Sequence, residues 1–552
     1  MTDQTHDDAQ LDAVRSGYAF SGPALNLGAA VSGGTPVPDA QVGLPLGSMN
    51  RHGLIAGATG TGKTKTLQAM AEQLSEAGVP VFLSDMKGDL SGLAAEGQPS
   101  DKITERARSI GQEWTPTASP VEFLALGGEG RGVPIRTTVT SFGPVLLSKV
   151  LGLNDTQESA LGLIFHYADQ AGLALLDLKD LREVIMHLTS EEGKDELDGI
   201  GGVSKQTTGV ILRQLTTFAN GGAEVFFGEP EFDTRDLLRK AEDGRGVISC
   251  LELPGVASRP ELFSTFLMWL LAELFEELPE AGDLDKPKLV FFFDEAHLLF
   301  KDASKAFLDQ VVQTVRLIRS KGVGIFFVTQ APKDVPGDVL GQLGNRVQHA
   351  LRAFTPDDAK ALKATAKTFP TSEHDLEEVI PALGTGEAIV TVMSEDGAPT
   401  PVAITAVRAP ESSMEPAGEQ VIKESAAASP LMKDYGEAVD NESAYEILQK
   451  RAAADAEAED AAAAEKEAAE KGAAEDEAEI KTFLMLRRLM IGAYVGLRDD
   501  TEFAAELREA GFALSIDTLD PDEILMADEA GVDYVLSLNG SNRHLAERLR
   551  AT

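Results

Sequence analysis

The chain has 552 residues, of which 43% are hydrophobic and 25% charged, and both fractions are ordinary for a soluble globular protein. Its 89 acidic residues outnumber 49 basic residues, which gives a formal net charge of −40. This charge excludes a protein that coats nucleic acid with its whole surface, but it permits a local basic channel inside an acidic shell. The length corresponds to roughly three or four domains.

Cys250 is the single cysteine, which excludes an internal disulfide, and no Cys/His cluster has the spacing of zinc ligands. It lies in an apolar run, which predicts a buried core residue and not a reactive thiol. The first 15 residues are polar and acidic, which excludes a secretory signal, and the most apolar helical stretch, residues 262–275, is too short to span a bilayer. We therefore expect a cytoplasmic protein that does not enter a membrane.

In chain order, the apolar pattern predicts two halves of one α/β domain. Residues 1–45 are rich in glycine, proline and small polar residues, and we expect a tail with one or two short strands. Over residues 46–142, buried strands alternate with a helical pattern, which predicts the first half of a parallel sheet. Residues 143–241 read as successive amphipathic helices, a helical insertion. The second half, residues 242–410, has expected strands at 246–251, 288–293, 324–329, 346–353, 386–392 and 401–407.

The composition changes after Pro410. Residues 411–480 are predicted to form an acidic helical linker, in which residues 451–480 contain 14 Ala, 11 acidic and 3 basic residues without a sustained apolar heptad repeat. This pattern fits a solvated single helix or a partly disordered linker, with a coiled coil as the alternative. Residues 481–552 again alternate between helical and strand patterns, which predicts a small α/β module, to which we assign no activity.

A glycine-rich loop follows the first apolar run of the domain. It reads Gly57-Ala-Thr-Gly-Thr-Gly-Lys-Thr64 and matches the P-loop pattern at every fixed position. The glycines allow backbone N–H groups to surround a phosphate at a helix N-terminus. The Lys63 ammonium reaches the β- and γ-phosphate oxygens, and the Thr64 hydroxyl is a Mg²⁺ ligand. We therefore predict ATP and Mg²⁺ as cofactors, with nucleotide contacts from Gly57, Ala58, Thr59, Gly60, Thr61, Gly62, Lys63, Thr64 and Lys65.

The strand at 288–293 ends in two carboxylates, as a Walker B element does. Asp294 is predicted to hold the Mg²⁺ shell, and Glu295 to orient or deprotonate the attacking water. The tetrapeptide Asp294-Glu-Ala-His297 also resembles the DEAH box of another helicase superfamily. That class requires a second RecA-like domain, for which no candidate follows Val407, and we therefore disfavour it.

Polar residues after other strands extend this candidate site. Gln330 ends the strand at 324–329 and is a candidate γ-phosphate sensor. Arg346 and Arg352 flank a short strand, and either is a candidate arginine finger for a neighbouring subunit, while at least one has the alternative of an ordinary surface arginine. Asp85 and Asp89 follow another strand, and they either adjust the metal shell or cap the next helix.

Basic residues are sparse, but six of them gather between residues 205 and 245. They either line a nucleic-acid channel or form a solvated helix face. They are Lys205, Arg213, Arg235, Arg239, Lys240 and Arg245.

Over about residues 20–410, the chain resembles the bacterial HerA-like ATPases of the HerA/FtsK superfamily, and more narrowly the subgroup with the helicase HerA-like C-terminal domain. The segments that carry the resemblance include GLIAGATGTGKT, PVFLSDMKGDLSGLA, LVFFFDEAHLLF and LGNRVQHALRAFTP. It implies a RecA-like ASCE P-loop NTPase core, a ring-shaped homo-oligomer, usually a hexamer, and translocation of DNA.

The resemblance also implies roles for individual residues. It gives the P-loop roles to Lys63 and Thr64, the Walker B roles to Asp294 and Glu295, the sensor role to Gln330, and the role of the downstream arginine to Arg352, with Arg346 as the alternate. The chain departs from the family in three places. Too few residues precede the P-loop for the N-terminal β-barrel of HerA proper, and the acidic linker and the 481–552 module do not match the family's usual ending.

Two functions compete on this evidence. The first is an oligomeric, Mg²⁺-dependent ATPase motor that moves along double-stranded DNA, with hydrolysis at subunit interfaces. The second is an ATP-driven ring that recruits or gates an unidentified protein partner through the acidic C-terminal arm, which the charge of −40 favours. A third, small-molecule phosphotransfer, requires an acceptor site and a lid that we do not find in the sequence.

Overall fold

The computed structural model describes residues 2–199, 201–253, 260–282, 284–300 and 305–497. They belong to two compact units, Met1–Leu448 and Gln449–Thr552. The first unit contains the sheet, and the described part of the second is helical. Residues 498–552, which make up most of the small α/β module expected over residues 481–552, lie outside the described residues. No helix among the described residues is both long and apolar enough to cross a membrane.

Twelve strands of the first unit form one sheet in the order β2-β1-β12-β11-β10-β3-β9-β8-β4-β7-β5-β6. Neighbours from β10 to β6 are parallel, whereas neighbours from β2 to β10 are antiparallel. The parallel, helix-covered α/β core that the sequence predicts is therefore present. The strands are β1 (Ala24–Ser32), β2 (Thr35–Pro45), β3 (Gly53–Ala56), β4 (Val81–Asp85), β5 (Val121–Leu126), β6 (Val133–Ile135), β7 (Ile248–Glu252), β8 (Leu289–Phe293), β9 (Val323–Thr329), β10 (Asn345–His349), β11 (Glu387–Thr391) and β12 (Ala403–Val407).

The central parallel strands are buried on both faces, which explains their almost continuous apolar sequences. In β8, Phe292 packs into the core shared with helix α2 (Lys63–Glu76). Its neighbour Phe291 points to the opposite face and packs with α9 (Pro260–Glu277) and α11 (Lys305–Ile318). This alternation follows from the two-residue period of a strand. The polar ends of these strands are therefore held between two packed helical layers.

Residues 1–45, for which we expected a tail with short strands, form part of the main sheet. After helix α1 (Thr2–Gly17), β1 and β2 form a hairpin, and β1 pairs with the distant strand β12. The hairpin turns at Gly33 and Gly34, whose φ angles are 56° and 76°. Two consecutive residues with positive φ are typical of the tightest hairpin turns and favour glycine. Glycines that suggested a tail thus serve a hairpin.

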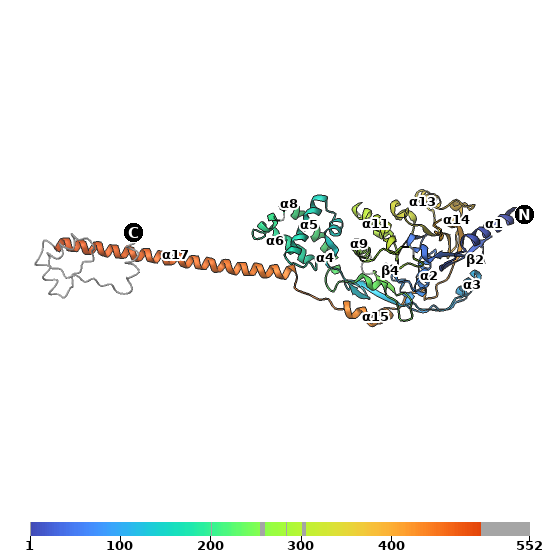
Figure 1. Ribbon diagram of the computed structural model, residues 1–552, viewed down its shortest axis with the longest axis horizontal. Coiled ribbons are helices and arrows are strands. Elements are labelled where there is room, and N and C mark those ends of the chain that lie inside the picture. The colour runs from blue at the N-terminus through green and yellow to red at the C-terminus, as the bar shows by residue number, and fades with distance from the viewer. Residues whose placement is uncertain (1, 200, 254–259, 283, 301–304, 498–552) are drawn as a thin grey trace. The chain divides into compact units, whose positions relative to one another are not determined.

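Helices that follow β6 group together in the first unit (Figure 1). Helices α5, α6 and α8 each begin after a side chain that accepts a backbone N–H of the first turn, namely Asn154, Asp177 and Ser204. Their buried apolar residues join the same core as one face of the sheet. The helices are α4 (Val139–Val150), α5 (Asp155–Gln170), α6 (Leu178–Thr189), α7 (Lys194–Gly199) and α8 (Lys205–Asn220).

The remaining short helices of the first unit connect strands or lie beyond the last strand. They are α3 (Asp101–Ile110), α10 (His297–Phe300), α12 (Gly337–Leu340), α13 (Pro356–Ala366), α14 (Leu376–Ala382), α15 (Glu419–Ala428) and α16 (Leu431–Tyr435). The last two bury Ile422 and Leu431 in the sheet cores, and the first unit continues to Leu448. Part of the range that we assigned to the linker, residues 411–448, therefore packs on the α/β core.

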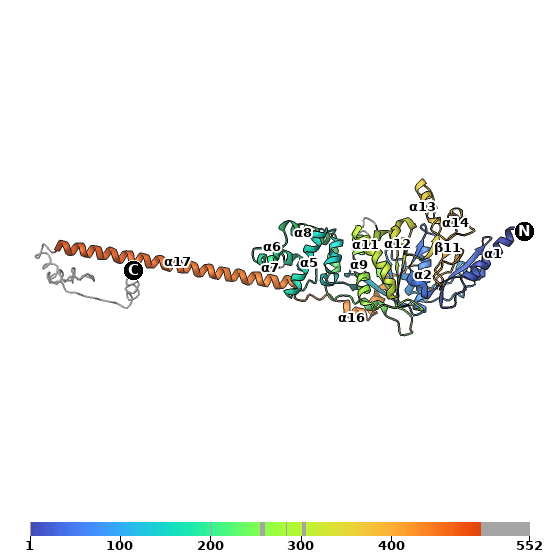
Figure 2. The ribbon, with the colours of Figure 1, turned by 45° about the horizontal axis from the view of Figure 1, so that its top comes forward.

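The second unit contains most of α17 (Ala444–Leu497), a continuous helix of 54 residues (Figure 2). Its side chains from residue 449 to 475 are all exposed. Glu467 pairs with Lys471 at 2.7 Å, and Glu477 pairs with Lys481 at 2.8 Å, both in the i, i+4 spacing that supports an isolated helix. The structure thus has the solvated single helix that was one of the expected forms of this segment.

Candidate active site

The P-loop lies at the carboxyl end of β3, the strand between β10 and β9. Neighbouring strand ends hold the loop: Gly57 N–H donates to Thr329 O at 3.2 Å, and Ala58 N–H donates to Ala350 O at 2.8 Å. The loop passes into α2 at Gly62, whose φ of 116° is a left-handed conformation that favours glycine. The local sequence therefore creates the strand, loop and helix N-terminus that a phosphate-binding site requires.

Two side chains of the loop converge on one carbonyl. Ala58 O accepts the Thr61 hydroxyl at 2.8 Å and the Lys63 ammonium at 3.2 Å. Burial lowers the pKa of Lys63, and the charges of Glu295 and Asp294 partly oppose that shift. Lys63 thus belongs to the same electrostatic site as the two Walker B carboxylates. Thr64 lies in the first turn of α2, beside this lysine.

Asp294 and Glu295 follow directly after β8, and β9 separates their strand from the P-loop strand. The turn is fixed on both sides, because Asp294 N–H donates to the Ser84 hydroxyl at 3.2 Å and Ala296 N–H donates to Val328 O at 2.8 Å. Between these bonds, Glu295 has a φ of 49°, a conformation that costs an L-residue about 1–2 kcal/mol.

The two carboxylates have opposite electrostatic surroundings although both are buried. Burial, followed by the charges of Glu295 and Asp89, raises the pKa of Asp294 to about 7. Burial also acts to raise the pKa of Glu295, but the hydrogen bond and charge of Lys87, with smaller contributions from His297 and Lys63, outweigh it and lower the pKa. The charge of Lys87 acts on Asp294 as well, but among the described residues only Glu295 has the direct contact with this ammonium.

Three buried carboxylate oxygens at this site have no hydrogen-bond partner among the described residues. They are Asp89 Oδ1, Asp294 Oδ2 and Glu295 Oε2. His297 Nδ1 lies 3.1 Å from Glu295 Oε2 but is not aligned for a hydrogen bond. Buried polar atoms are nearly always paired, and these oxygens are therefore available to a ligand such as a metal ion. Hard oxygen donors, together with the Thr64 hydroxyl, fit the preference of Mg²⁺.

Two of the remaining candidates, Gln330 and Arg352, follow the carboxyl ends of neighbouring parts of the sheet. Gln330 is exposed and directly follows β9, between the P-loop and Walker B strands. Arg352 is exposed and follows Ala350, the residue that binds the P-loop, and its guanidinium donates to Pro381 O and Leu383 O at the end of α14. Both residues therefore lie at the nucleotide edge of the sheet.

Arg346 has a different location. It lies near the amino end of β10, opposite Leu54 near the start of β3, and it is half-buried. Its guanidinium donates to Leu340 O at 3.3 Å and Leu343 O at 3.4 Å. The parallel register thus holds Arg346 toward the edge opposite the P-loop, whereas Arg352 lies at the P-loop edge.

The sequence left two roles open for Asp85 and Asp89: capping the next helix or adjusting the metal shell. In the structure the two carboxylates have different surroundings. The Asp85 carboxylate accepts backbone N–H groups from Lys87 at 3.2 Å, Gly88 at 2.7 Å and Leu90 at 2.9 Å, so it caps the turn after β4. Asp89 instead leaves an oxygen unpaired and raises the pKa of Asp294, which places its charge near the metal-type ligands.

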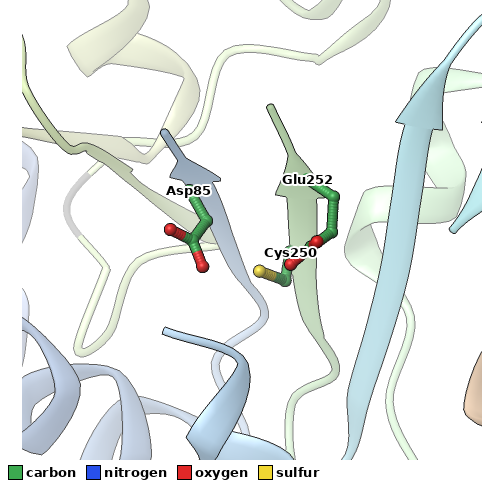
Figure 3. A group of neighbouring side chains, drawn as sticks. All are labelled: Asp85, Cys250 and Glu252. Carbon is green, nitrogen blue, oxygen red and sulfur yellow. The ribbon is translucent and has the colours of Figure 1, made fainter. Parts of the chain in front are cut away.

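Asp85 also belongs to a buried cluster with Cys250 and Glu252 at the ends of the paired strands β4 and β7 (Figure 3). Burial raises the pKa of the Cys250 thiol, and burial together with the charge of Asp85 raises the pKa of Glu252 to about 7. Glu252 Oε1 has no partner among the described residues. Cys250 is fully buried in the core, as its apolar sequence context predicts.

Lys87 is the feature of the site to which sequence reasoning gave no role. Its ammonium forms an ion pair with Glu295 Oε1. The pairing depends on β4 and β8 being neighbours, a fact that neither motif contains. The available signal was weak: a lysine shortly after a predicted strand of a parallel sheet, at the same edge as the P-loop.

Three of the six basic residues between 205 and 245 pair with carboxylates of the same chain. Arg235 pairs with Asp233 at 2.5 Å and Arg245 with Asp243 at 2.7 Å, and Arg239 contacts the Glu122 carboxylate. These arginines therefore do not form a purely cationic surface.

Comparisons with known proteins identify the family of the chain. The family model described as "Helicase HerA-like C-terminal" matches residues 32–490. The DNA double-strand break repair helicase HerA of Sulfurisphaera tokodaii is 24% identical over 356 residues, covering 64% of each chain. Its counterpart from Sulfolobus acidocaldarius is 22% identical over 351 residues, covering 63% of this chain and 64% of the relative. The chain thus spans about 64% of the length of these two relatives.

Among solved structures, the bacterial conjugative coupling protein TrwB is similar, with a TM-score of 0.48 and 14% identity over 73% of this chain and 95% of that chain. The family match extends over most of the sequence and includes both nucleotide motifs. With its P-loop at the end of β3 and its acidic pair at the end of β8, the chain belongs to the helicase HerA-like C-terminal family of P-loop ATPases.

Proposed function

We propose that the protein is a Mg²⁺-dependent ATP-hydrolysing motor whose ring-shaped oligomers, most simply hexamers, translocate double-stranded DNA. The observation that carries the proposal is the meeting of Lys63, Asp294 and Glu295 at one sheet edge. Buried carboxylate oxygens there have no hydrogen-bond partner among the described residues. An unpaired buried carboxylate costs folding free energy, and a bound metal with nucleotide offsets that cost.

In the proposed reaction, the P-loop N–H groups and Lys63 bind the β- and γ-phosphates. Asp294, Thr64 and nearby Asp89 are the residues that would hold Mg²⁺, which supplies positive charge to the phosphate oxygens. Glu295 accepts a proton from water as the water oxygen bonds to the γ-phosphorus. The bond from that phosphorus to the β–γ bridging oxygen then breaks, giving ADP and phosphate.

Assembly into a ring would complete the site. Arg352 is exposed at the nucleotide edge, and its two contacts are with carbonyl oxygens of its own chain and not with the carboxylates of the site. We assign it as the arginine that one subunit donates to the nucleotide of the next, where it stabilises the charge of the transferring phosphoryl group. Gln330, between the two motifs, would contact the γ-phosphate.

The test is steady-state ATP hydrolysis by the full chain with and without linear duplex DNA, at low and moderate salt, together with the mass of the particle. We expect a ring-sized particle whose hydrolysis rises several-fold with DNA, and a stimulation that declines with salt because phosphate contacts release counterions. An assembled ring that hydrolyses ATP without any response to DNA would contradict translocation.

A second candidate is an ATP-driven scaffold that recruits or gates a protein partner. The pairing of Arg235, Arg239 and Arg245 with carboxylates favours it, because these arginines offer less free positive charge to DNA. The acidic helix α17 would then be the docking arm. Its test is to compare partner recovery by the full chain and by a chain ending at residue 448, and equal recovery would contradict the scaffold.

A further inference from the structure

The ion pair between Lys87 and Glu295 joins two neighbouring strand ends. Lys87 follows β4, and Glu295 follows β8. In the sheet, the order is β3, β9, β8, β4, so β4 lies on the far side of β8 from the P-loop strand. The Lys87 ammonium binds Glu295 Oε1 and thus ties this carboxylate to the turn that follows β4.

The backbone on both sides of the pair is fixed. Asp85 accepts the N–H groups of Lys87 and Gly88, which fixes the turn that carries the lysine. The Asp294 and Ala296 N–H groups are bonded to β4 and β9, which fixes the turn that carries Glu295. The pair therefore opens and closes through its side chains alone.

The two side chains differ in their access to solvent. The Glu295 side chain is 7% exposed, whereas the Lys87 side chain is 52% exposed. The lysine is thus the member that can leave, since its flexible chain already reaches the surface and its ammonium can be hydrated there. The Glu295 side chain is buried and has no comparable path to solvent. When Lys87 leaves, Glu295 therefore stays in the site as a carboxylate that can accept a proton.

We propose that Lys87 is a positioning residue that restrains Glu295, and that the DNA-stimulated state is the one in which this ion pair is open. The inference rests on the proposed function, because it takes Glu295 as the group that accepts the proton of water. The ion pair holds the carboxylate by Oε1 and thereby fixes the orientation of Oε2, the oxygen without a hydrogen-bond partner among the described residues. Oε2 can then turn toward a water beside the γ-phosphate only when the pair opens. The closed pair therefore keeps basal hydrolysis slow.

The test compares the full-length wild type with Lys87→Met, Lys87→Arg and Lys102→Met, the last a matched control at an exposed lysine of α3. We expect Lys87→Met to raise the basal kcat several-fold, to leave the KM for ATP within about twofold, and to reduce DNA stimulation toward none. Lys87→Arg keeps a cation for the pair and should behave as the wild type, as should Lys102→Met. Thermal unfolding and binding of fluorescent ADP confirm that each variant is folded, and Lys87→Gln replaces Lys87→Met if the latter is not.

A merely structural lysine would not raise kcat when removed. If Lys87→Met hydrolyses ATP at or below the wild-type basal rate, the restraint is refuted, and a fall in kcat at constant KM would assign Lys87 to the transition state instead. Basal acceleration with unchanged DNA stimulation would refute the link to DNA. A wild type and a Lys87→Met variant that are both inactive would overturn the proposed function as well, whereas an active wild type with a slower variant overturns the inference alone.

Discussion

Charged residues have opposite arrangements at the nucleotide edge of the sheet and at the two exposed or partly exposed arginines Arg235 and Arg245. At the nucleotide edge, Asp294 is buried with an unpaired oxygen, and its pKa is raised to about 7. Arg235 and Arg245, by contrast, each pair with an aspartate two residues earlier in the chain. A charge that is satisfied by its own neighbours stabilises a local turn, whereas a buried charge without a partner is retained at a cost. The difference separates residues kept for a ligand from residues kept for local structure.

The largest effect is expected at the nucleotide edge from Glu295→Gln. Removing the proton acceptor should lower kcat by up to roughly 10⁴-fold and leave ATP binding intact, because the amide keeps the shape of the side chain. Single-turnover hydrolysis and fluorescent-nucleotide binding measure the two effects separately, with exposed Glu378→Gln on α14 as the control. Hydrolysis at the wild-type rate would show that Glu295 is not the base.

Arg346 near the start of β10 and Arg352 beyond its end allow the two ends of one strand to be compared. Arg352→Ala should lower hydrolysis by about 10³-fold in the assembled particle and have no effect on isolated subunits, because the guanidinium acts on the neighbour's nucleotide. Arg346→Ala should leave catalysis near the wild-type rate, since Arg346 lies toward the opposite edge. Hydrolysis measured across a protein dilution series distinguishes the states. An equal loss in isolated subunits would place Arg352 in its own site.

Lys63→Ala should weaken ATP binding by roughly tenfold to a hundredfold, the value of a hydrogen bond to a charged group. Equilibrium titration with a fluorescent ATP analogue measures the dissociation constant. The loss should be smaller for ADP, because Lys63 also reaches the γ-phosphate. Unchanged affinity for both nucleotides would contradict the P-loop role of this lysine.

The buried cluster beside the site predicts a pH-dependent stability. The pKa of Glu252 is raised to about 7 in the folded state, so the stability it permits is present at low pH and is lost as the pH rises from about 4 through 7. Glu252→Gln should therefore raise the free energy of unfolding by about 1–2 kcal/mol at pH 8 and change little at pH 5. Denaturant unfolding at both pH values provides the measurement. An equal effect at both would show that Glu252 does not titrate in this range.

The smallest effect is expected from the substitution of Arg235. Arg235→Ala should leave both basal and DNA-stimulated hydrolysis unchanged, because Asp233 neutralises this exposed arginine. The salt dependence of DNA stimulation is the sensitive measurement, since each lost phosphate contact lowers its slope. A reduced slope would show that Arg235 contacts DNA and would remove the distinction between this arginine and the ligand-binding charges of the nucleotide edge.

The sequence determined the chemistry of the site, because its motifs are local. A strand, a glycine loop and Lys63 form one contiguous segment, and Asp294 with Glu295 ends another, so the P-loop ATPase assignment required no distant contact. The roles proposed for Gln330, Arg352 and Arg346 stay predictions, although the parallel register already separates the two arginines.

Only the tertiary structure decided which segments meet. The pairing of β1 with β12 joins Gly28 to Val407, and no local pattern encodes a partner so distant in the chain. The same is true of Lys87, whose contact with Glu295 exists only because β4 was placed beside β8. Local residue patterns define strands and loops through short-range sterics and hydrogen bonding, whereas strand order is set by the packing of the whole sheet against its two helical layers.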